Sequence, residues 1–305
     1  MTETPKNSVP EFRVNPEPKS TAKSLLSLGI ILFVILTLMG VWVGFFSGFT
    51  GARGDPQKLL EIVKSSNPEL ARGAALEWSQ KYSQTNPLGV AETGIVLSRL
   101  TQMGVVKFPF SAALLLMLGD SVQPEKVQPV ICSALETQSG GGEEFALVLA
   151  GLGKSLGRGY FLTATCLESL SHFQNHPLPE IRATLATVLG AQFLKDSTQV
   201  ESWLNSLYGD SFEIVRRSAV LSMIQRDSST PLVLNFIESF FEESMNTSPR
   251  KYKVEDFDFS ISLIGVLKNN SRLTEALRPQ IENLGQKHPN LRIRSEFKKI
   301  LEHQK

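Results

Sequence analysis

Four groups of residues in this sequence have types and spacings that could do chemistry. Gly153-Lys154-Ser155 has the ending of a phosphate-binding loop, whose lysine contacts the phosphates. The complete loop also needs a glycine five residues before Gly153, and Val148 stands there, with a side chain that would obstruct the backbone amides. The apolar periodicity favours a helix that ends at Gly157 and Gly159. No nucleotide site is therefore expected.

A second glycine cluster and a pair of histidines are also incomplete as sites. Residues 139–142 (Ser-Gly-Gly-Gly) precede two glutamates, which suit the start of a helix and repel a phosphate. His172 and His176 have the i, i+4 spacing of helical zinc ligands, but a zinc ion needs a third ligand, and Pro177 ends the helix. We therefore predict no metal site, no cofactor, no catalytic residue and no enzymatic activity.

The two cysteines, Cys132 and Cys166, are 34 residues apart and have apolar neighbours. At equivalent positions of two stacked helices they would be separated by an interaxial distance of about 8–10 Å. A disulfide needs Cα atoms closer than about 7 Å. Buried free thiols are therefore the prediction, with a disulfide as the alternative.

The overall charge excludes a general attraction to nucleic acid. The chain has 305 residues, with 31 basic and 30 acidic side chains and a formal net charge of +1. A balance this close to neutral gives no sequence-independent pull toward phosphate backbones. We expect no nucleic-acid partner.

The elements that would carry these residues are helices. From residue 55 to 305, apolar side chains recur at three- and four-residue spacing, and no sustained alternation indicates a strand. Proline, glycine, asparagine and aspartate separate fourteen helix candidates, which suggest about seven antiparallel pairs. The candidates are 55–65, 68–83, 87–103, 109–119, 124–138, 143–156, 159–173, 177–195, 198–208, 211–227, 230–245, 254–269, 273–286 and 289–303.

Four of these candidates share an apolar residue followed by arginine, with further apolar positions four and seven or eight residues later. The arginines are separated by 110, 34 and 78 residues, close to multiples of about 34–39. A helix with such a stripe must stack on the equivalent helix of the next unit to bury it. We predict that the arginines pack their stems and bond neighbouring carbonyls or acids. They are Arg72, Arg182, Arg216 and Arg294.

The repeated segments resemble the second helix of HEAT-type repeats. The resemblance is carried by residues 177–183 (Pro-Leu-Pro-Glu-Ile-Arg-Ala), continuing to Leu189-Gly190, and by residues 213–219 (Glu-Ile-Val-Arg-Arg-Ser-Ala). It implies an all-α fold, an α-solenoid that serves as a scaffold or binding surface, over residues 55–305. A helical bundle without repeats is the alternative.

A charge-free segment precedes this domain. Between residues 25 and 49 only three side chains are polar, and Thr50 follows. As a helix these 25 residues would be roughly 37 Å long, enough to cross a bilayer. We predict a single transmembrane helix over residues 25–50, after a disordered tail (1–24) and before a short linker (51–54). The alternatives are a signal peptide cleaved after Ala52 and a buried helix. Basic residues on both flanks are nearly balanced and slightly favour a cytoplasmic tail, with the domain on the opposite side of the membrane.

Gly40, Gly44 and Gly48 lie on one face of this predicted helix, because they recur every four residues. Such a face lets another helix approach closely, so we predict helix packing through the membrane segment, either with a second copy as a homodimer or with a helix of another protein.

The sequence therefore predicts a membrane-anchored, HEAT-like scaffold or adaptor that mediates protein–protein interaction, with a partner that the sequence does not name. Two other functions are alternatives: a HEAT-like enzyme or cofactor-attachment factor, and a self-associating structural subunit of a membrane complex. The segment around residues 246–253 and the basic C-terminal helix are candidate contact surfaces.

Overall fold

The computed structural model of this chain describes residues 55–82, 87–103, 110–137, 142, 144–159, 162–191, 194, 198–226, 230–248 and 252–303. Apart from Asp55, all of them belong to one compact unit, Pro56–Lys305. Within them the regular secondary structure is helical, so the expected all-α class is confirmed, and a single isolated backbone bridge joins Leu88 and Ser121.

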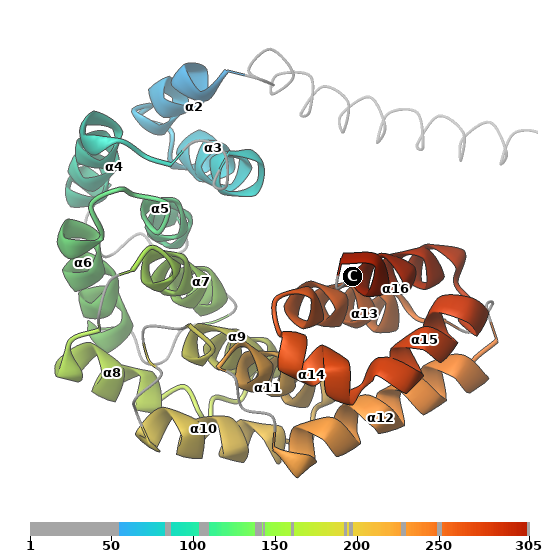
Figure 1. Cartoon of the computed structure of the whole chain (residues 1–305). Coiled ribbons are helices and arrows are strands. Elements are labelled where there is room, and N and C mark those ends of the chain that lie inside the picture. Colours follow the sequence, from blue (N-terminus) through green and yellow to red (C-terminus); the bar gives the residue numbers. More distant parts are fainter. Residues whose placement is uncertain are drawn as a thin grey trace, which may run out of the picture. The chain divides into compact units, whose positions relative to one another are not determined.

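The described part of the chain contains fifteen helices, labelled α2 to α16 (Figure 1). They are α2 (Pro56–Val63), α3 (Pro68–Lys81), α4 (Val90–Met103), α5 (Phe110–Leu118), α6 (Pro124–Thr137), α7 (Glu144–Gly157), α8 (Ala164–Ser171), α9 (Pro179–Leu189), α10 (Thr198–Tyr208), α11 (Glu213–Gln225), α12 (Pro231–Asn246), α13 (Val254–Lys268), α14 (Ser271–Ala276), α15 (Arg278–Lys287) and α16 (Leu291–His303). The candidate expected at 273–286 is two helices, because α14 ends before Leu277 and α15 begins after it.

The helices pack in neighbouring pairs and form two rows within this unit (Figure 1). We call the helices α3, α5, α7, α9, α11, α13 and α16 the inner row; each contacts the next one in this order. The remaining helices form the outer row; most of them pack against the inner row, as α2 does on α3 and α6 on α7, whereas α8 packs on α6 of its own row. Segments about one helix pair apart in the sequence therefore lie side by side in the inner row.

Local signals in the sequence explain where several helices begin. Asn67 precedes Pro68, and its side chain accepts a hydrogen bond of 2.9 Å from the Glu69 amide at the start of α3. Asn290 does the same for Arg292 at the start of α16, at 3.0 Å. These side chains satisfy amides that the first turn of a helix leaves without a partner.

The helix expected from Pro87 begins three residues later, at Val90. Leu88 is extended instead, because its amide donates to the Asp120 carbonyl (3.0 Å) and its carbonyl accepts from the Val122 amide (2.9 Å). This pairing ties the segment before α4 to the end of α5, a contact that local sequence signals do not encode.

Helix α5 is part of the core, and every residue from Ser111 to Leu118 is buried. Its neighbours α3, α4 and α7 cover it. On α7, Gly151 lies so close to α5 that an added Cβ atom would be 2.5 Å from the Leu115 carbonyl oxygen. Real Cβ contacts are essentially never that short, so glycine is required for this packing.

The prediction of a single-pass membrane protein is corrected by the structure. Among the described residues, no helix has both the length and the apolar character that a membrane span requires. The longest of these helices, α12, has 16 residues, whereas a span needs about 20. A single-pass anchor and a membrane localisation are therefore not supported. The segment predicted at 25–50, with Gly40, Gly44 and Gly48 and the homodimer face they would form, lies outside the described residues.

Candidate binding groove on the inner row

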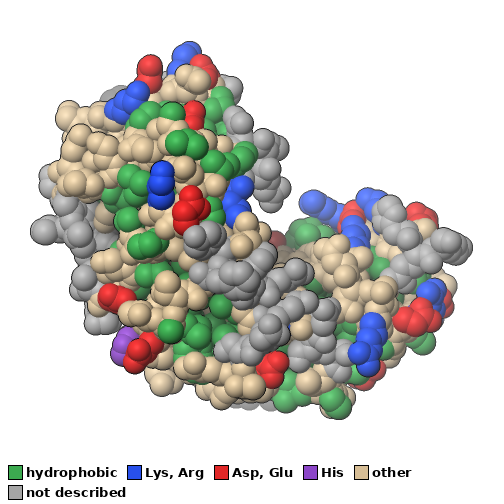
Figure 2. Space-filling model, turned by 60° about the vertical axis from the view of Figure 1, so that its left-hand side comes forward, with side chains coloured by type: hydrophobic (Ala, Val, Ile, Leu, Met, Phe, Trp, Pro, Cys, Tyr) green, Lys and Arg blue, Asp and Glu red, His purple; other side chains and the backbone are tan. Residues whose placement is uncertain are grey.

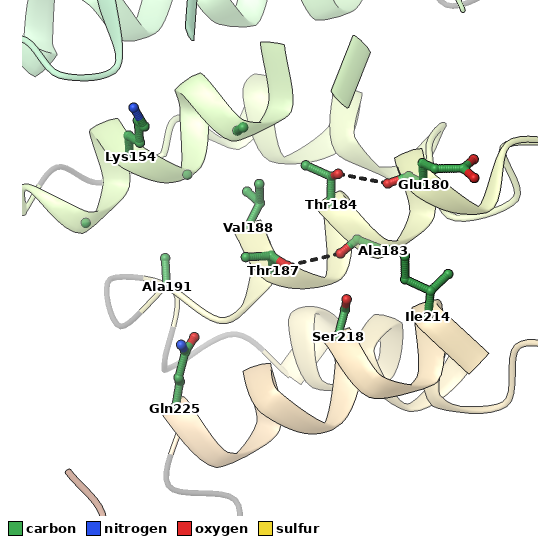
Figure 3. Close-up of a pocket in the computed structure, with 13 residues that line it drawn as sticks. Lys154, Glu180, Ala183, Thr184, Thr187, Val188, Ala191, Ile214, Ser218 and Gln225 are labelled. Atoms are coloured by element: carbon green, nitrogen blue, oxygen red, sulfur yellow. Dashed lines mark hydrogen bonds between the residues drawn. The ribbon is translucent and has the colours of Figure 1, made fainter. Parts of the chain in front are cut away.

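A groove of about 720 Å³ runs across three helices of the inner row, α7, α9 and α11 (Figure 3). We call it the inner groove. Most side chains that line it are small or apolar, and Lys154 and Glu180 are its two charged residues (Figure 3). The others are Ala150, Gly153, Gly157, Ala183, Thr184, Thr187, Val188, Ala191, Ile214, Ser218 and Gln225.

The threonines on α9 do not make the floor of the groove strongly polar. Thr184 donates its hydroxyl hydrogen to the Glu180 carbonyl (2.8 Å), and Thr187 donates to the Ala183 carbonyl (3.1 Å) (Figure 3). Because both donors are used within the helix, neither threonine has a hydroxyl hydrogen left for a ligand. The floor therefore offers apolar contact more than directed hydrogen bonds.

Lys154 stands at one end of the groove and is held by the protein itself. Its Nζ donates to Asp120 Oδ2 (3.0 Å) and to the Ser79 carbonyl (3.2 Å). Burial raises the pKa of the Asp120 carboxyl above its ordinary value, and the charge of Lys154 opposes that shift. Lys154 is therefore the counter-ion of a buried carboxylate, which is a structural role.

The surroundings of Lys154 also show why residues 153–155 do not form a phosphate loop. They lie inside α7, which runs without a break from Glu144 to Gly157. Backbone amides within a helix donate to carbonyls of the same helix and cannot wrap a phosphate. Gly159 follows with φ 99°, a backbone conformation that favours glycine, and the helix has ended before it, as the sequence predicts.

Ile214 links the inner groove to a second hollow, of about 360 Å³, between α11 and α13. Ile214 and Ser218 line both spaces, and the second adds Leu221, Asp258 and Phe259. The Ile214 side chain is 51% exposed, although its neighbour Val215 is fully buried. An apolar side chain that stands free between two hollows is a natural anchor point for a binding partner.

Arg217 also lines the second hollow, and its two terminal nitrogens are engaged by the protein, although its buried Nε has no hydrogen-bond partner in the described part of the chain. Its guanidinium donates to Asp256 (2.6 Å), to Glu213 and to the Glu255 carbonyl (3.1 Å). It also lies over the Phe259 ring, 5.1 Å from the ring centre. Like Lys154, Arg217 is therefore not available to attract an anion.

Three exposed carboxylates along the two hollows have no ion-pair partner among the described residues: those of Glu180, Glu255 and Asp258. We call them the acidic edge. Glu180 belongs to the first turn of α9 and Glu255 to that of α13, while Asp258 lies further along α13. With both cations of the lining already paired, the free charge along the groove is negative.

Three of the arginines singled out by the sequence make the same local contact. Arg182 donates to the His176 and Pro177 carbonyls. Arg216 donates to the Asp210 and Ser211 carbonyls, both at 2.9 Å. Arg294 donates twice to the His288 carbonyl, at 2.6 and 2.8 Å. In each case the acceptor lies five or six residues before the arginine, in the turn that leads into the helix. Arg72, the fourth, is half-buried in α3, and its Nε has no hydrogen-bond partner in the described part of the chain.

The histidine pair does not converge on a common point. His172 is exposed at the end of α8, whereas His176 is buried and its Nδ1 accepts from the Leu178 amide (3.2 Å). Across the residues that the structure describes, no group of three or more His, Cys, Asp or Glu side chains could hold a metal ion.

The cysteines form a disulfide, so the prediction of free thiols is wrong. Cys132 in α6 and Cys166 in α8 have Cα atoms 5.3 Å apart. The expected separation of 8–10 Å assumed equivalent positions on stacked helices. The two helices, α6 and α8, pack against each other in the outer row. Their facing sides bring the two Cα atoms closer together than the usual distance between helix axes, and within the range of a disulfide.

Charge on the molecular surface is mixed. On the face that Figure 2 presents, basic and acidic side chains alternate among polar and apolar ones and form no continuous patch of one sign. The C-terminal helix follows this pattern, because Glu296 pairs with Lys268 (3.1 Å) and with Lys299 (2.6 Å). Of the segment at 246–253, residues 249–251 lie outside the described residues.

No protein-family model matches this chain, and no curated protein or solved structure is found to match it. The resemblance to HEAT-type repeats thus stays a prediction, based on the quoted residues.

Proposed function

We propose that this protein is an α-solenoid of HEAT-like helix pairs that acts as a scaffold or adaptor, binding a partner protein along its inner row. The alternation of inner and outer helices supports the repeat architecture, because each inner helix contacts the next one along the chain. The shared contact of Arg182, Arg216 and Arg294 supports it as well, since the same local geometry recurs in three helix pairs.

The observation that carries the binding function is the inner groove with the half-exposed Ile214 at its border. Its lining supplies apolar contact and no pair of side chains arranged as nucleophile and base. A surface of this kind gains free energy from burying a complementary apolar surface, at roughly 25 cal/mol per Å².

A photo-crosslinking experiment tests the proposal. A benzophenone amino acid is introduced at Thr187, which is exposed within the groove, or at Glu201, which is exposed on the outer helix α10. After irradiation in the cells that express the full chain, the Thr187 probe should give a defined protein adduct that the Glu201 probe does not give. Replacing Ile214 by glutamate should remove that adduct.

Identical adducts from both positions, or none from Thr187, would contradict the proposal. The variants must first give the circular dichroism spectrum and thermal unfolding midpoint of the unmodified protein, so that a lost adduct reports on the groove and not on the fold.

A further inference from the structure

We infer that the segment bound in the inner groove is a basic amphipathic helix of the partner protein, with its apolar stripe on the groove floor and its Lys or Arg side chains facing the acidic edge. This inference rests on the proposed function and specifies the chemistry of the partner. The shape of the groove floor, the charge of the acidic edge and the exposed side chain of Ile214 each support it.

The shape of the floor suits a helix. Three of the four lining residues on α7, Ala150, Gly153 and Gly157, are small and follow one another at three- and four-residue spacing, so they lie on one face, which they share with Lys154 at one end of the groove. Ala183 and Thr187 continue this surface on α9. Small residues let another helix approach closely, because no long side chain stands between the two backbones.

The free charge selects a cationic helix. The two cations of the lining, Lys154 and Arg217, are paired with Asp120 and Asp256, at 3.0 and 2.6 Å. The carboxylates of the acidic edge are exposed and have no such partner in the described part of the chain. Lys or Arg on the bound segment would therefore meet exposed carboxylates that are not already held in a close ion pair.

The helix dipole does not account for all of these carboxylates. Acidic residues in the first turn of a helix stabilise it, which gives Glu180 and Glu255 a structural reason to be there. Asp258 lies beyond the first turn of α13, where the dipole effect has faded, and it lines the hollow next to Ile214. The dipole of α13 therefore gives no structural role to Asp258, whose exposed carboxylate is available to a basic residue of a bound segment.

Ile214 supplies the apolar part of the recognition. It stands between the inner groove and the hollow that Asp258 lines, so a helix with apolar residues on one face and basic residues beside them can contact both at once. Helix-in-groove recognition uses this arrangement, with a few apolar anchors fixing the register.

A peptide selection tests the inference. Random peptides of about 16 residues, enough for roughly four helical turns, are selected for binding to the immobilised full chain. Enriched peptides are then measured by fluorescence anisotropy against the unmodified protein and three variants. The first is Glu180→Lys with Asp258→Lys, the second is Ile214→Glu, and the third, a control, is Glu201→Lys. Glu201 is the matched control because it is exposed in the first turn of an outer helix, as Glu180 is in an inner one.

The inference requires enriched peptides with a net positive charge and apolar residues at three- and four-residue spacing. Their affinity should fall roughly tenfold or more in the first two variants and stay unchanged in the control. Neutral or acidic peptides that still depend on Ile214 would overturn the inference and leave the proposed function standing. Peptides indifferent to both groove variants, or no enrichment at all, would also overturn it, while the crosslinking experiment decides the proposed function separately.

Discussion

Arg182 and Asp210 are joined by two parallel hydrogen bonds, from Nε to Oδ2 at 2.6 Å and from Nη2 to Oδ1 at 2.9 Å. Each side chain is about 10% exposed. The arginine belongs to α9 and the aspartate to the turn before α11, so the pair connects two successive inner helices. The Arg182 hydrogen bond holds the pKa of the Asp210 carboxyl below its ordinary value, and the Phe212 amide adds to this effect.

Replacing Asp210 by asparagine should lower the free energy of unfolding by about 2 kcal/mol, between the values typical of exposed and of fully buried pairs. Because the folded-state pKa is depressed, this stabilisation is present above the unfolded-state pKa of about 3.9 and is lost as the pH falls through the lower folded-state value. Urea titrations at pH 7 and at successively lower pH measure both effects.

Glu275→Gln is the control for this variant, because Glu275 pairs with Arg278 through similarly short bonds but on the exposed surface. It should leave the unfolding curve unchanged. Equal losses in the two variants would show that burial is not what makes the Arg182–Asp210 pair strong.

Two glycines of the same helix should respond differently to alanine. At Gly151 the new Cβ atom would lie 2.5 Å from the Leu115 carbonyl oxygen, so α5 and α7 must move apart, and a loss of roughly 1–3 kcal/mol is expected. At Gly157 nothing lies within 4 Å of the added atom, and the better helix propensity of alanine should leave stability unchanged or raised by up to about 1 kcal/mol. Thermal unfolding of both variants compares them; a Gly151→Ala variant as stable as Gly157→Ala would refute the close packing.

The helices were largely predictable from the sequence, for a physical reason. Apolar spacing sets which segments must be buried, and start signals such as Asn67-Pro68 act within a few residues, so α3 begins at Pro68 as expected. The start of α4 differed because a distant segment, residues 120–122, competes for the backbone of Leu88. The residues next to Leu88 in the sequence do not show that a distant segment will form hydrogen bonds with its backbone.

The groove could not be predicted in the same way. The pair Ile214-Val215 has two apolar residues in sequence, and which one is left exposed depends on how α11 packs on its neighbours. The sequence signals for the groove are modest: several small residues on one face of α7 and an acidic residue, Asp258, outside a first helical turn. The disulfide was missed because it depends on the approach of α6 to α8, which sequence spacing does not fix.

Stability should fall in mildly acidic solution because of His288. Its side chain is fully buried, its Nε2 is 2.7 Å from Ser244 Oγ, and its Nδ1 accepts from the Asn290 amide (3.0 Å). Burial lowers the pKa of the His288 imidazole below its ordinary value, so the folded protein resists the proton that the unfolded chain accepts. The contribution is complete above an unfolded-state pKa of about 6.5 and is lost as the pH falls from there through the folded-state value.

The free energy of unfolding, measured by urea titration from pH 7.5 down to pH 5 in steps of about half a unit, should therefore decrease by at most about 1.4 kcal/mol per pH unit from this group. His288→Gln should flatten this slope even if it lowers stability at every pH. His172→Gln, at an exposed position at the end of α8, should leave the slope as it is. A slope that survives in His288→Gln would assign the acid sensitivity to another group.

The disulfide should contribute measurably to stability, because it joins two outer-row helices across 34 residues of sequence. Closing a loop of this size restricts the unfolded chain, and cross-links of this kind contribute typically about 2–4 kcal/mol. Replacing both cysteines by serine should therefore lower the urea midpoint, and dithiothreitol should lower that of the unmodified protein but not that of the variant. Thiol alkylation of protein denatured without reductant gives an independent measure. Two reactive thiols per chain, together with an unchanged midpoint in dithiothreitol, would mean that Cys132 and Cys166 are not bonded in the isolated protein.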